Sequence, residues 1–226
     1  MDFHTYFFEV IFISKSIKYI IIILYLAILT VFLSNFMLKM DDKRADKKDQ
    51  AYIHNDYTSD ERFSDFKYFP VALNFSETSS IYYEDTYGDE RTYGGDRLHE
   101  GIDIMSANNI RGELPVVSVC DGVIENIGWL ELGGYRIGIR SENDVYYYYA
   151  HLYRYDDNIA EGDEVLAGQI LGYMGDSGYS KVEGTVGNFP VHLHFGIYIK
   201  EKGEEISINP YEILKKYEKN ILRYDF

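Results

Sequence analysis

The chain has 226 residues and a formal net charge of −15, and hydrophobic residues make up 46% of it. This length and apolar content suffice for a full-sized domain with its own core. The negative charge excludes nucleic-acid binding by phosphate neutralisation. Cys120 is the only cysteine, which excludes an intrachain disulfide.

The first predicted element is an apolar segment, Tyr19 to Leu38, which carries no charged side chain. A helix of that length covers about 30 Å, the thickness of a bilayer's hydrocarbon core. No Ala-x-Ala cleavage site follows it, so residues 1–40 are predicted to hold an uncleaved single-pass membrane anchor. Several cations follow the segment, and by the positive-inside rule they put the rest of the chain in the cytoplasm: Lys39, Lys43, Arg44, Lys47 and Lys48.

Residues 41–68 are charged and show no sustained periodicity, which predicts a linker. From residue 69 to 212, short apolar runs separated by glycine-rich turns predict a mainly β domain with an antiparallel sheet or sandwich. The predicted strands are Val116–Val123, Tyr135–Arg140, Val145–His151, Gln169–Met174 and His192–Ile199. Residues 213–226 are predicted to be a helical tail, opened by Asn209 as the cap and Pro210 at the first helical position.

Four of the six histidines fall in three short motifs: His99-Glu100-Gly101-Ile102-Asp103, Tyr149-Ala150-His151-Leu152 and His192-Leu193-His194-Phe195. Imidazole nitrogen and carboxylate oxygen are zinc ligands, and a catalytic zinc needs three of them plus an open position for water. The motifs offer three ligands and leave two imidazoles for proton transfer. Because alternate side chains of a strand face the same way, His192 and His194 are predicted to share a face.

These motifs resemble those of the lysostaphin-type zinc endopeptidases, which include LytM-like cell-wall hydrolases. The resemblance covers about residues 85 to 212. Four further segments occur in the order that this family has them: Asp121-Gly122-Val123, Gly133-Gly134-Tyr135, Gly162 to Gln169, and Gly175 to Gly178. The resemblance therefore implies the lysostaphin-type β fold.

Carried over by position, the resemblance implies that one Zn²⁺ is bound by three residues: His99, Asp103 and His194. It makes His151 and His192 the catalytic pair that handles protons, and leaves open which of them is the general base. Tyr93, six residues before His99, corresponds to a tyrosine that could donate a hydrogen bond to the oxyanion.

The implied reaction is hydrolysis of amide bonds in the stem or cross-bridge peptides of bacterial peptidoglycan, by a water that the metal activates. The specific bond stays open. This activity needs the domain outside the cytoplasm, at the bacterial cell membrane, whereas the flanking charges favour the opposite orientation. We side with the chemistry and expect an extracytoplasmic domain.

Two alternatives remain at this point. A peptidase fold with an intact site can serve as a membrane-anchored scaffold or activator of cell-wall remodelling in division or sporulation. The segment Glu161 to Gln169 also resembles the turn of lipoyl or biotinyl carrier domains, but no Met-Lys or Asp-Lys dipeptide stands at a hairpin tip to hold their cofactor.

Overall fold

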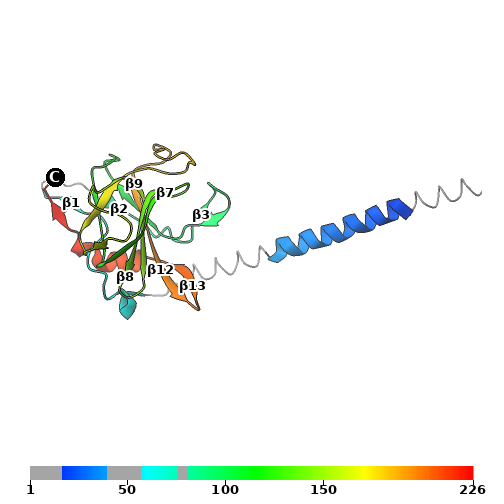
Figure 1. Cartoon of the computed structure of the whole chain (residues 1–226), viewed down its shortest axis with the longest axis horizontal. Helices are drawn as coiled ribbons and strands as arrows, with labels where there is room; N and C mark the ends of the chain where they lie inside the picture. The colour runs from blue at the N-terminus through cyan, green and yellow to red at the C-terminus, as the bar shows by residue number, and fades with distance from the viewer. Residues whose placement is uncertain (1–16, 40–56, 76–80, 226) are drawn as a thin grey trace, which may run out of the picture. The chain divides into compact units, whose positions relative to one another are not determined.

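The computed structural model describes residues 17–39, 57–75 and 81–225. The chain divides into two compact units, 1–50 and 51–226, which Figure 1 shows. In the first unit the described residues form one helix, Ile17–Lys39, which is strongly apolar and has no buried side chains. This confirms an apolar N-terminal helix around the predicted segment 19–38, with the length and composition of a bilayer-spanning helix.

The second unit is built on a ten-stranded sheet. Its order is β10-β7-β8-β9-β12-β5-β2, with β13 beside β12 and β11 paired with both β6 and β9. All of these pairings are antiparallel. The strands are β2 (Ile81–Tyr82), β5 (Ile102–Ser106), β6 (Pro115–Val117), β7 (Gly122–Leu130), β8 (Gly134–Ser141), β9 (Tyr146–Tyr155), β10 (Glu164–Val165), β11 (Ile170–Met174), β12 (His192–Glu201) and β13 (Glu204–Ile208).

Smaller elements complete the unit. A parallel pair joins β1 (Leu73–Asn74) to β14 (Arg223–Tyr224), and an antiparallel pair joins β3 (Glu90–Arg91) to β4 (Arg97–Leu98). The helical elements are η1 (Tyr57–Ser59), η2 (Glu61–Phe63), α2 (Tyr211–Tyr217) and η3 (Glu218–Asn220). The predicted mainly β, antiparallel fold with a short C-terminal helix is therefore confirmed.

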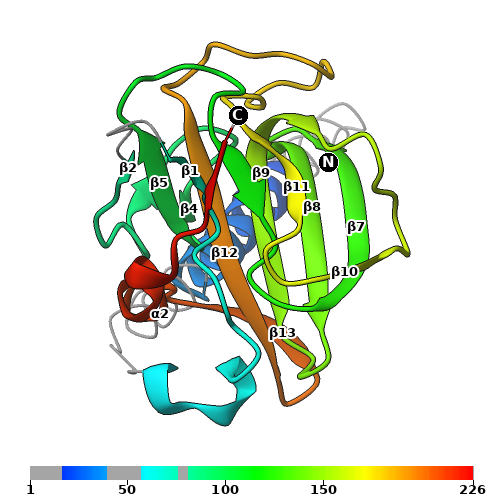
Figure 2. The same cartoon turned by 90° about the vertical axis from the view of Figure 1, so that its left-hand side faces the viewer.

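The core lies on one face of the sheet, and alternation along the strands separates it from the other face. In β12, the side chains of Leu193, Phe195 and Ile197 are fully buried, and in β9 those of Tyr147 and Tyr149 are buried beside them. Figure 2 shows β12 in the middle of the sheet, between β5 and β9. The intervening residues of these strands are free to form a polar site on the opposite face.

One predicted strand is divided in two. Residues 116–123 form the end of β6 and the start of β7, separated by 118–121. The chain leaves the sheet there because its backbone bonds to other segments: Ser118 donates to the carbonyl of Gln169, and the carbonyl of Val119 accepts from Lys67. β7 then runs on to Leu130, with a register shift between Ile124 and Asn126 that hides its alternation in the sequence.

The predicted linker 41–68 ends earlier than expected. Its residues 41–56 lie outside the described part of the structure, but 57–68 carry η1 and η2 and belong to the second unit. Phe63 and Phe66 are buried in the core, and the ring of Phe66 packs 5.7 Å from that of Tyr147 and 4.8 Å from that of Tyr217. These two apolar residues stand among charged and polar ones, so the sequence of this segment shows no periodicity that would predict its burial.

The C-terminal tail also differs from the prediction. The helix begins at Tyr211 with Pro210 at the cap position, one residue later than predicted, and Asn209 Oδ1 accepts the backbone N–H of Tyr211 at 2.9 Å from the position before the cap. After the short η3, the chain extends into β14 beside β1. The tail is thus only partly helical, because residues 223–224 find backbone partners in β1.

Candidate active site

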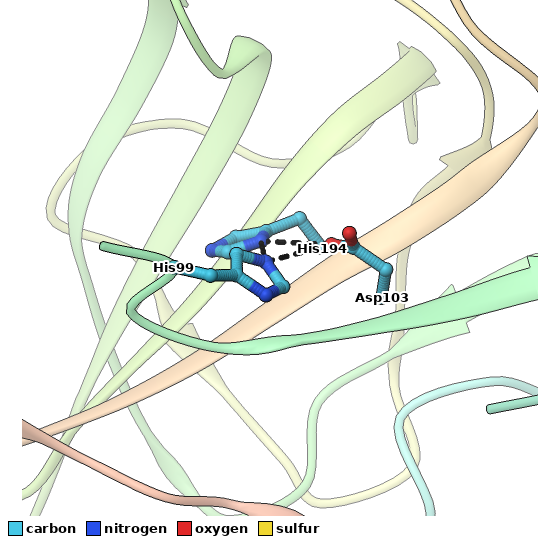
Figure 3. Close-up of side chains that lie close together, drawn as sticks. All are labelled: His99, Asp103 and His194. Atoms are coloured by element: carbon cyan, nitrogen blue, oxygen red, sulfur yellow. Dashed lines mark hydrogen bonds and ion pairs between the residues drawn. The ribbon is translucent and has the colours of Figure 1, made fainter. Parts of the chain in front are cut away.

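The residues of the predicted metal site come together on the polar face of the sheet. His99 follows β4, Asp103 lies in β5 and His194 lies in β12. Asp103 and His194 are directly opposed in the β5–β12 pairing, so the register of the sheet itself sets them side by side. Figure 3 shows the three side chains turned toward a common point.

Three donor atoms of these side chains form a small triangle. His99 Nε2 lies 2.8 Å from His194 Nδ1 and 3.0 Å from Asp103 Oδ1, and the latter two atoms are 3.1 Å apart. Ligands held at about 2.0–2.1 Å by one tetrahedral ion lie about 3.3 Å from each other. The observed triangle therefore needs to open by only a few tenths of an ångström, and the donor set of two nitrogens and one oxygen fits zinc.

Gly101 makes room for this arrangement, between the two ligands of the first motif. A Cβ atom at this position would lie 2.5 Å from the carbonyl oxygen of Phe195 and 2.8 Å from the ring of His194. No real Cβ approaches backbone that closely. The absence of a side chain at Gly101 thus lets the His194 ring reach His99 and Asp103.

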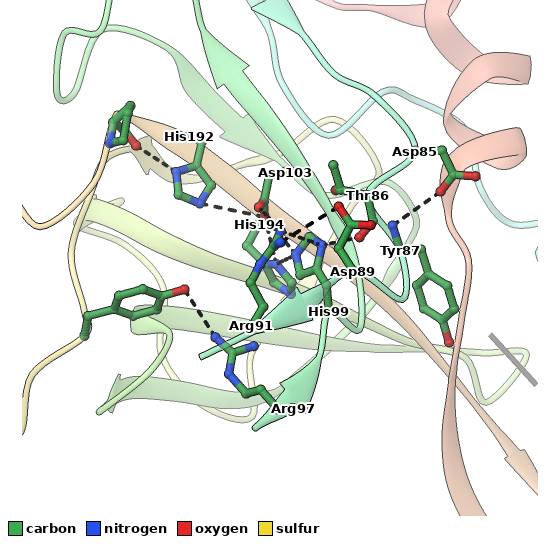
Figure 4. Close-up of polar contacts among 12 residues, drawn as sticks. Asp85, Thr86, Tyr87, Asp89, Arg91, Arg97, His99, Asp103, His192 and His194 are labelled. Carbon is green, nitrogen blue, oxygen red and sulfur yellow. Dashed lines mark hydrogen bonds and ion pairs between the residues drawn. The ribbon is translucent and has the colours of Figure 1, made fainter. Parts of the chain in front are cut away.

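Two residues that sequence analysis missed hold the predicted ligands from outside, as Figure 4 shows. The carbonyl of Thr86 lies 2.9 Å from His99 Nδ1, and Arg91 Nη2 lies 3.0 Å from that atom and 3.0 Å from Asp103 Oδ2. One ring nitrogen cannot both donate and accept. We assign a proton to Nδ1, which donates to Thr86, because Nε2 must be free to bind a metal. Arg91 then donates to Asp103 and orients its carboxylate.

His192 lies beside the triangle but outside it. Its Nδ1 lies 2.7 Å from the carbonyl oxygen of Pro190, so this nitrogen carries the proton and donates. Its Nε2 is then an unprotonated base, 3.7 Å from Asp103 Oδ1. His192 and His194 therefore do share a face of β12, with Leu193 buried between them.

His151 reaches the site through an irregularity in β9. Tyr135 and Ile137, two positions apart in β8, pair with Leu152 and Tyr149, which are three positions apart in β9. The extra residue in β9 makes a β-bulge. Within it His151 has a φ of 64°, an uncommon value for a residue other than glycine. The bulge turns the side chain of His151 toward the polar face, against the alternation of the strand.

The backbone and side chain of His151 are both fixed by hydrogen bonds. Its N–H donates to the carbonyl of Gly133 at 2.7 Å, and its Nδ1 donates to the carbonyl of Ser177 at 2.8 Å. The ring lies 4.7 Å from the ring of His192, centroid to centroid. Both histidines of the predicted catalytic pair thus present an unprotonated Nε2 beside the triangle.

Electrostatics favour the protonation states that bind a metal. Burial lowers the pKa of His194 to about 4, lowers that of His192, and lowers that of His151 well below its ordinary value. Burial by itself would raise the pKa of Asp103, but the adjacent imidazoles of His194 and His99 outweigh it and lower that pKa. At neutral pH these three imidazoles are neutral and Asp103 is an anion, as metal binding requires.

Tyr93 is not among the residues that line the site. Its ring is 40% exposed and stacks on Tyr179 at 4.3 Å, and its hydroxyl donates to the carbonyl of Tyr179. Tyr179 is the one of the two that lines the cavity. The hydroxyl of Tyr93 would have to leave this carbonyl before it could donate to a substrate.

A cavity of about 480 Å³ opens over the triangle and the two free imidazoles. It extends along the polar face of β8, β9 and β12, where residues that sequence analysis did not single out form its wall: Arg136, Tyr146, Tyr148 and Tyr198. The only signal of the three tyrosines in the sequence is their parity. Tyr198 stands an even number of positions from His194 along β12, and Tyr146 and Tyr148 stand an even number of positions from its partner Ala150 along β9.

Comparison with known proteins identifies the class. The family model "Peptidase family M23" matches residues 97–210, a range that contains the triangle and both further histidines. The chain belongs to peptidase family M23. The predicted resemblance to lysostaphin-type endopeptidases is thereby confirmed, and with it the fold class.

Among relatives, L-Ala–D-Glu endopeptidase of Bacillus subtilis is 45% identical over 157 residues, which is 70% of this chain and 44% of that protein. Lysostaphin of Staphylococcus staphylolyticus is 33% identical over 120 residues, 52% of this chain and 22% of that protein. A solved lytM structure from Ruminococcus gnavus is 51% identical with a TM-score of 0.67, over 73% of this chain and 65% of that one. The chain thus spans less than half the length of these two curated relatives.

Proposed function

We propose that this chain is a membrane-anchored zinc endopeptidase that hydrolyses amide bonds in the stem or cross-bridge peptides of peptidoglycan. The observation that carries the proposal is the triangle of His99, Asp103 and His194 donor atoms, 2.8–3.1 Å apart. Two imidazoles with an unprotonated nitrogen, His151 and His192, lie directly beside it. Three ligands next to two proton acceptors is the composition that metal-assisted hydrolysis needs.

His99, Asp103 and His194 would hold the ion. The ion would supply Lewis-acid chemistry, lowering the pKa of a water molecule and polarising the scissile carbonyl. Thr86 and Arg91 keep the ligands in place, and such outer contacts typically change metal affinity about 10–100-fold.

His151 and His192 would move the protons. One Nε2 accepts a proton from the attacking water, and a proton is then delivered to the leaving amine as its C–N bond breaks. Once protonated at Nε2, an imidazole of this pair also donates a hydrogen bond to the oxygen of the former carbonyl. Since both Nδ1 atoms are bound to backbone carbonyls, each ring can accept and return a proton at Nε2 without turning.

The relatives support an amide bond of the bacterial wall as the target. One is named for the L-Ala–D-Glu bond, and another, from Staphylococcus capitis, is named a glycyl-glycine endopeptidase. A scaffold without catalysis has no observation in its favour, because all five predicted metal and catalytic positions are present and adjacent. A carrier domain is not supported either, since its segment lies inside the range matched to the peptidase family.

The helix Ile17–Lys39 would anchor the enzyme in the cell membrane and hold it near the wall. The substrate requires the catalytic unit to lie outside the cytoplasm, in spite of the cations that follow the helix. A protease added to intact protoplasts should therefore digest residues 51–226. Protection of this unit until the membrane is dissolved would contradict the proposed orientation.

The test of activity is digestion of purified peptidoglycans that differ in bridge chemistry, with product masses read out. The zinc-loaded chain should release peptides with new amino termini, and a chelator should stop the reaction until zinc is restored. A metal-loaded chain that releases no product from any of these peptidoglycans would contradict the proposal and favour a scaffold.

A further inference from the structure

The cavity reaches well beyond the metal triangle, along the polar face of β8, β9 and β12. Three tyrosines form a packed wall there: the ring of Tyr198 lies 6.0 Å from that of Tyr146 and 6.3 Å from that of Tyr148, in edge-to-face contacts. Arg136, on β8, lines the same cavity. This wall has room for substrate residues on one side of the scissile bond.

The register of the sheet puts Arg136 in line with the ligands. Because of the bulge in β9, Arg136 faces Ala150 and His151 across the β8–β9 pairing, and Ala150 faces His194 across the next pairing. Neighbouring strands are about 4.8 Å apart. The backbone of Arg136 is therefore roughly 10 Å from that of His194, and its long side chain can approach a group close to the reacting carbonyl.

The guanidinium of Arg136 has an unused donor. Its Nη1 is buried and has no hydrogen-bond partner among the described residues. Glu205, a carboxylate that lines the cavity, accepts instead from Arg140 Nη2 at 2.6 Å. A buried charged donor without a partner is costly, so its persistence in a binding cavity indicates a partner that arrives with the substrate.

The backbone at this position is held firmly. The Tyr155 hydroxyl accepts the N–H of Arg136 at 3.1 Å and donates to its carbonyl at 3.2 Å, and it also accepts the N–H of Gly128. Binding sites gain affinity when their groups are ordered in advance. Arg136 thus starts from an ordered strand beside an aromatic wall that excludes water.

We propose that Arg136 is a specificity residue that binds a free carboxylate of the substrate, on a residue next to the scissile bond. This inference rests on the proposed peptidase function. Guanidinium binds carboxylate through paired, charge-assisted hydrogen bonds. The positive charge of Arg136 also offsets, within the cavity, the repulsion of acidic peptides by the chain's net charge of −15. The chain therefore selects bonds beside an acidic residue over glycyl-glycine bonds.

A D-Glu residue meets this requirement, since one of its two carboxyl groups stays free when the other continues the chain. The test uses two synthetic peptides, L-Ala–D-Glu–L-Lys and the same peptide with the free carboxyl group of D-Glu converted to a carboxamide. The zinc-loaded full-length chain should cleave the acidic peptide with a kcat/KM about 10- to 100-fold higher, as a hydrogen-bonded charge pair predicts. In Arg136→Gln this ratio should fall toward one, mainly through KM.

Arg154→Gln is the matched control. Arg154 is also a strand arginine of the sheet, but it is exposed, its guanidinium lies 3.9 Å over the ring of Tyr173, and it is not among the residues that line the cavity. This variant should keep the wild-type ratio. Arg136→Gln should melt no lower than wild type, because it removes a donor without a partner.

Equal cleavage of both peptides by wild type, or an unchanged ratio in Arg136→Gln, would overturn the role of Arg136. If wild type cleaves neither peptide nor peptidoglycan, the proposed function fails instead. Calorimetric binding of the two peptides then still tests Arg136: wild type should bind the acidic peptide more tightly, and Arg136→Gln should not. Equal binding in both proteins would contradict the inference.

Discussion

The predicted site residues fall into two groups, according to the contacts of the ring nitrogen or carboxylate oxygen that faces away from the metal triangle. His151 and His192 each donate from Nδ1 to a backbone carbonyl and leave Nε2 open toward the cavity. The predicted ligands His99 and Asp103 are held from behind by Thr86 and Arg91. The division of roles implied by sequence resemblance therefore has a physical basis in these contacts, and it can be tested one residue at a time.

At this scale we predict opposite effects of two alanine variants. His194→Ala should lose both zinc and hydrolysis, because two remaining ligands hold the ion poorly. His151→Ala should keep one zinc per chain and lose about 10²–10⁴-fold in rate, the usual contribution of a general acid or base. Zinc content by mass spectrometry and turnover of peptidoglycan measure the two effects. Loss of zinc from His151→Ala with retention in His194→Ala would reverse the assignment.

Sequence alone could predict some of these residues and not others. The spacing of His192 and His194 predicts a shared face because strand alternation is local. Nothing in the sequence predicts that His151 adopts a positive φ, since the bulge arises from pairing with β8. No sequence motif predicts the role of Arg91 either, because its contact with Asp103 depends on the tertiary position of the β3–β4 hairpin beside β5.

At the scale of elements, close packing of β5 against β12 depends on Gly101. Gly101→Ala would put a Cβ 2.5 Å from the Phe195 carbonyl and 2.8 Å from the His194 ring, so the start of β5 and the ligand must both shift. We predict at least about a 10-fold loss of zinc affinity with the fold retained, comparable to loss of an outer metal contact.

Gly196→Ala is the comparison, in the middle of β12. Its Cβ would meet the edge of the Tyr198 ring at 3.0 Å, which that side chain can relieve, and the Glu100 carbonyl oxygen at 3.2 Å, a milder backbone contact than the one at Gly101. Competition with a chromogenic zinc chelator measures both affinities. If Gly101→Ala binds zinc as tightly as wild type, close approach at this position is not needed.

The strands themselves were predictable where alternation is regular and not where it is interrupted. β8, β9, β11 and β12 lie close to their predicted ranges, although β9 runs on to Tyr155. β7 was missed beyond Val123 because its register shift breaks the alternation of Ile124, Asn126 and their neighbours. Short β3 and β4 have only two residues each, too few to give a pattern.

At the scale of the whole molecule, the second unit begins before the predicted boundary. Phe63 and Phe66 lie in its core, although the surrounding residues are polar enough to suggest a linker. A sequence window averages these two rings with their charged neighbours, whereas the fold buries only the rings. The boundary therefore depends on tertiary contacts with Tyr147 and Tyr217.

We predict that a chain beginning at residue 51 melts in one transition and that a chain beginning at residue 69 is strongly destabilised. Loss of one buried phenylalanine costs about 3–5 kcal/mol, and a domain of this size loses about 2–4 °C in melting temperature per kcal/mol. The shorter chain should melt at least about 10 °C lower or remain unfolded, as thermal circular dichroism would detect. Equal melting temperatures would contradict the revised boundary.

The central claim is that one zinc ion sits among three side chains from separate strands and loops, and its most direct test is anomalous X-ray scattering from zinc-supplied crystals. At the zinc absorption edge we predict a single peak, about 2.0–2.2 Å from His99 Nε2, Asp103 Oδ1 and His194 Nδ1. His151 and His192 should lie outside bonding distance of it. A peak bound instead by His151 or His192, or no peak at all, would contradict the account.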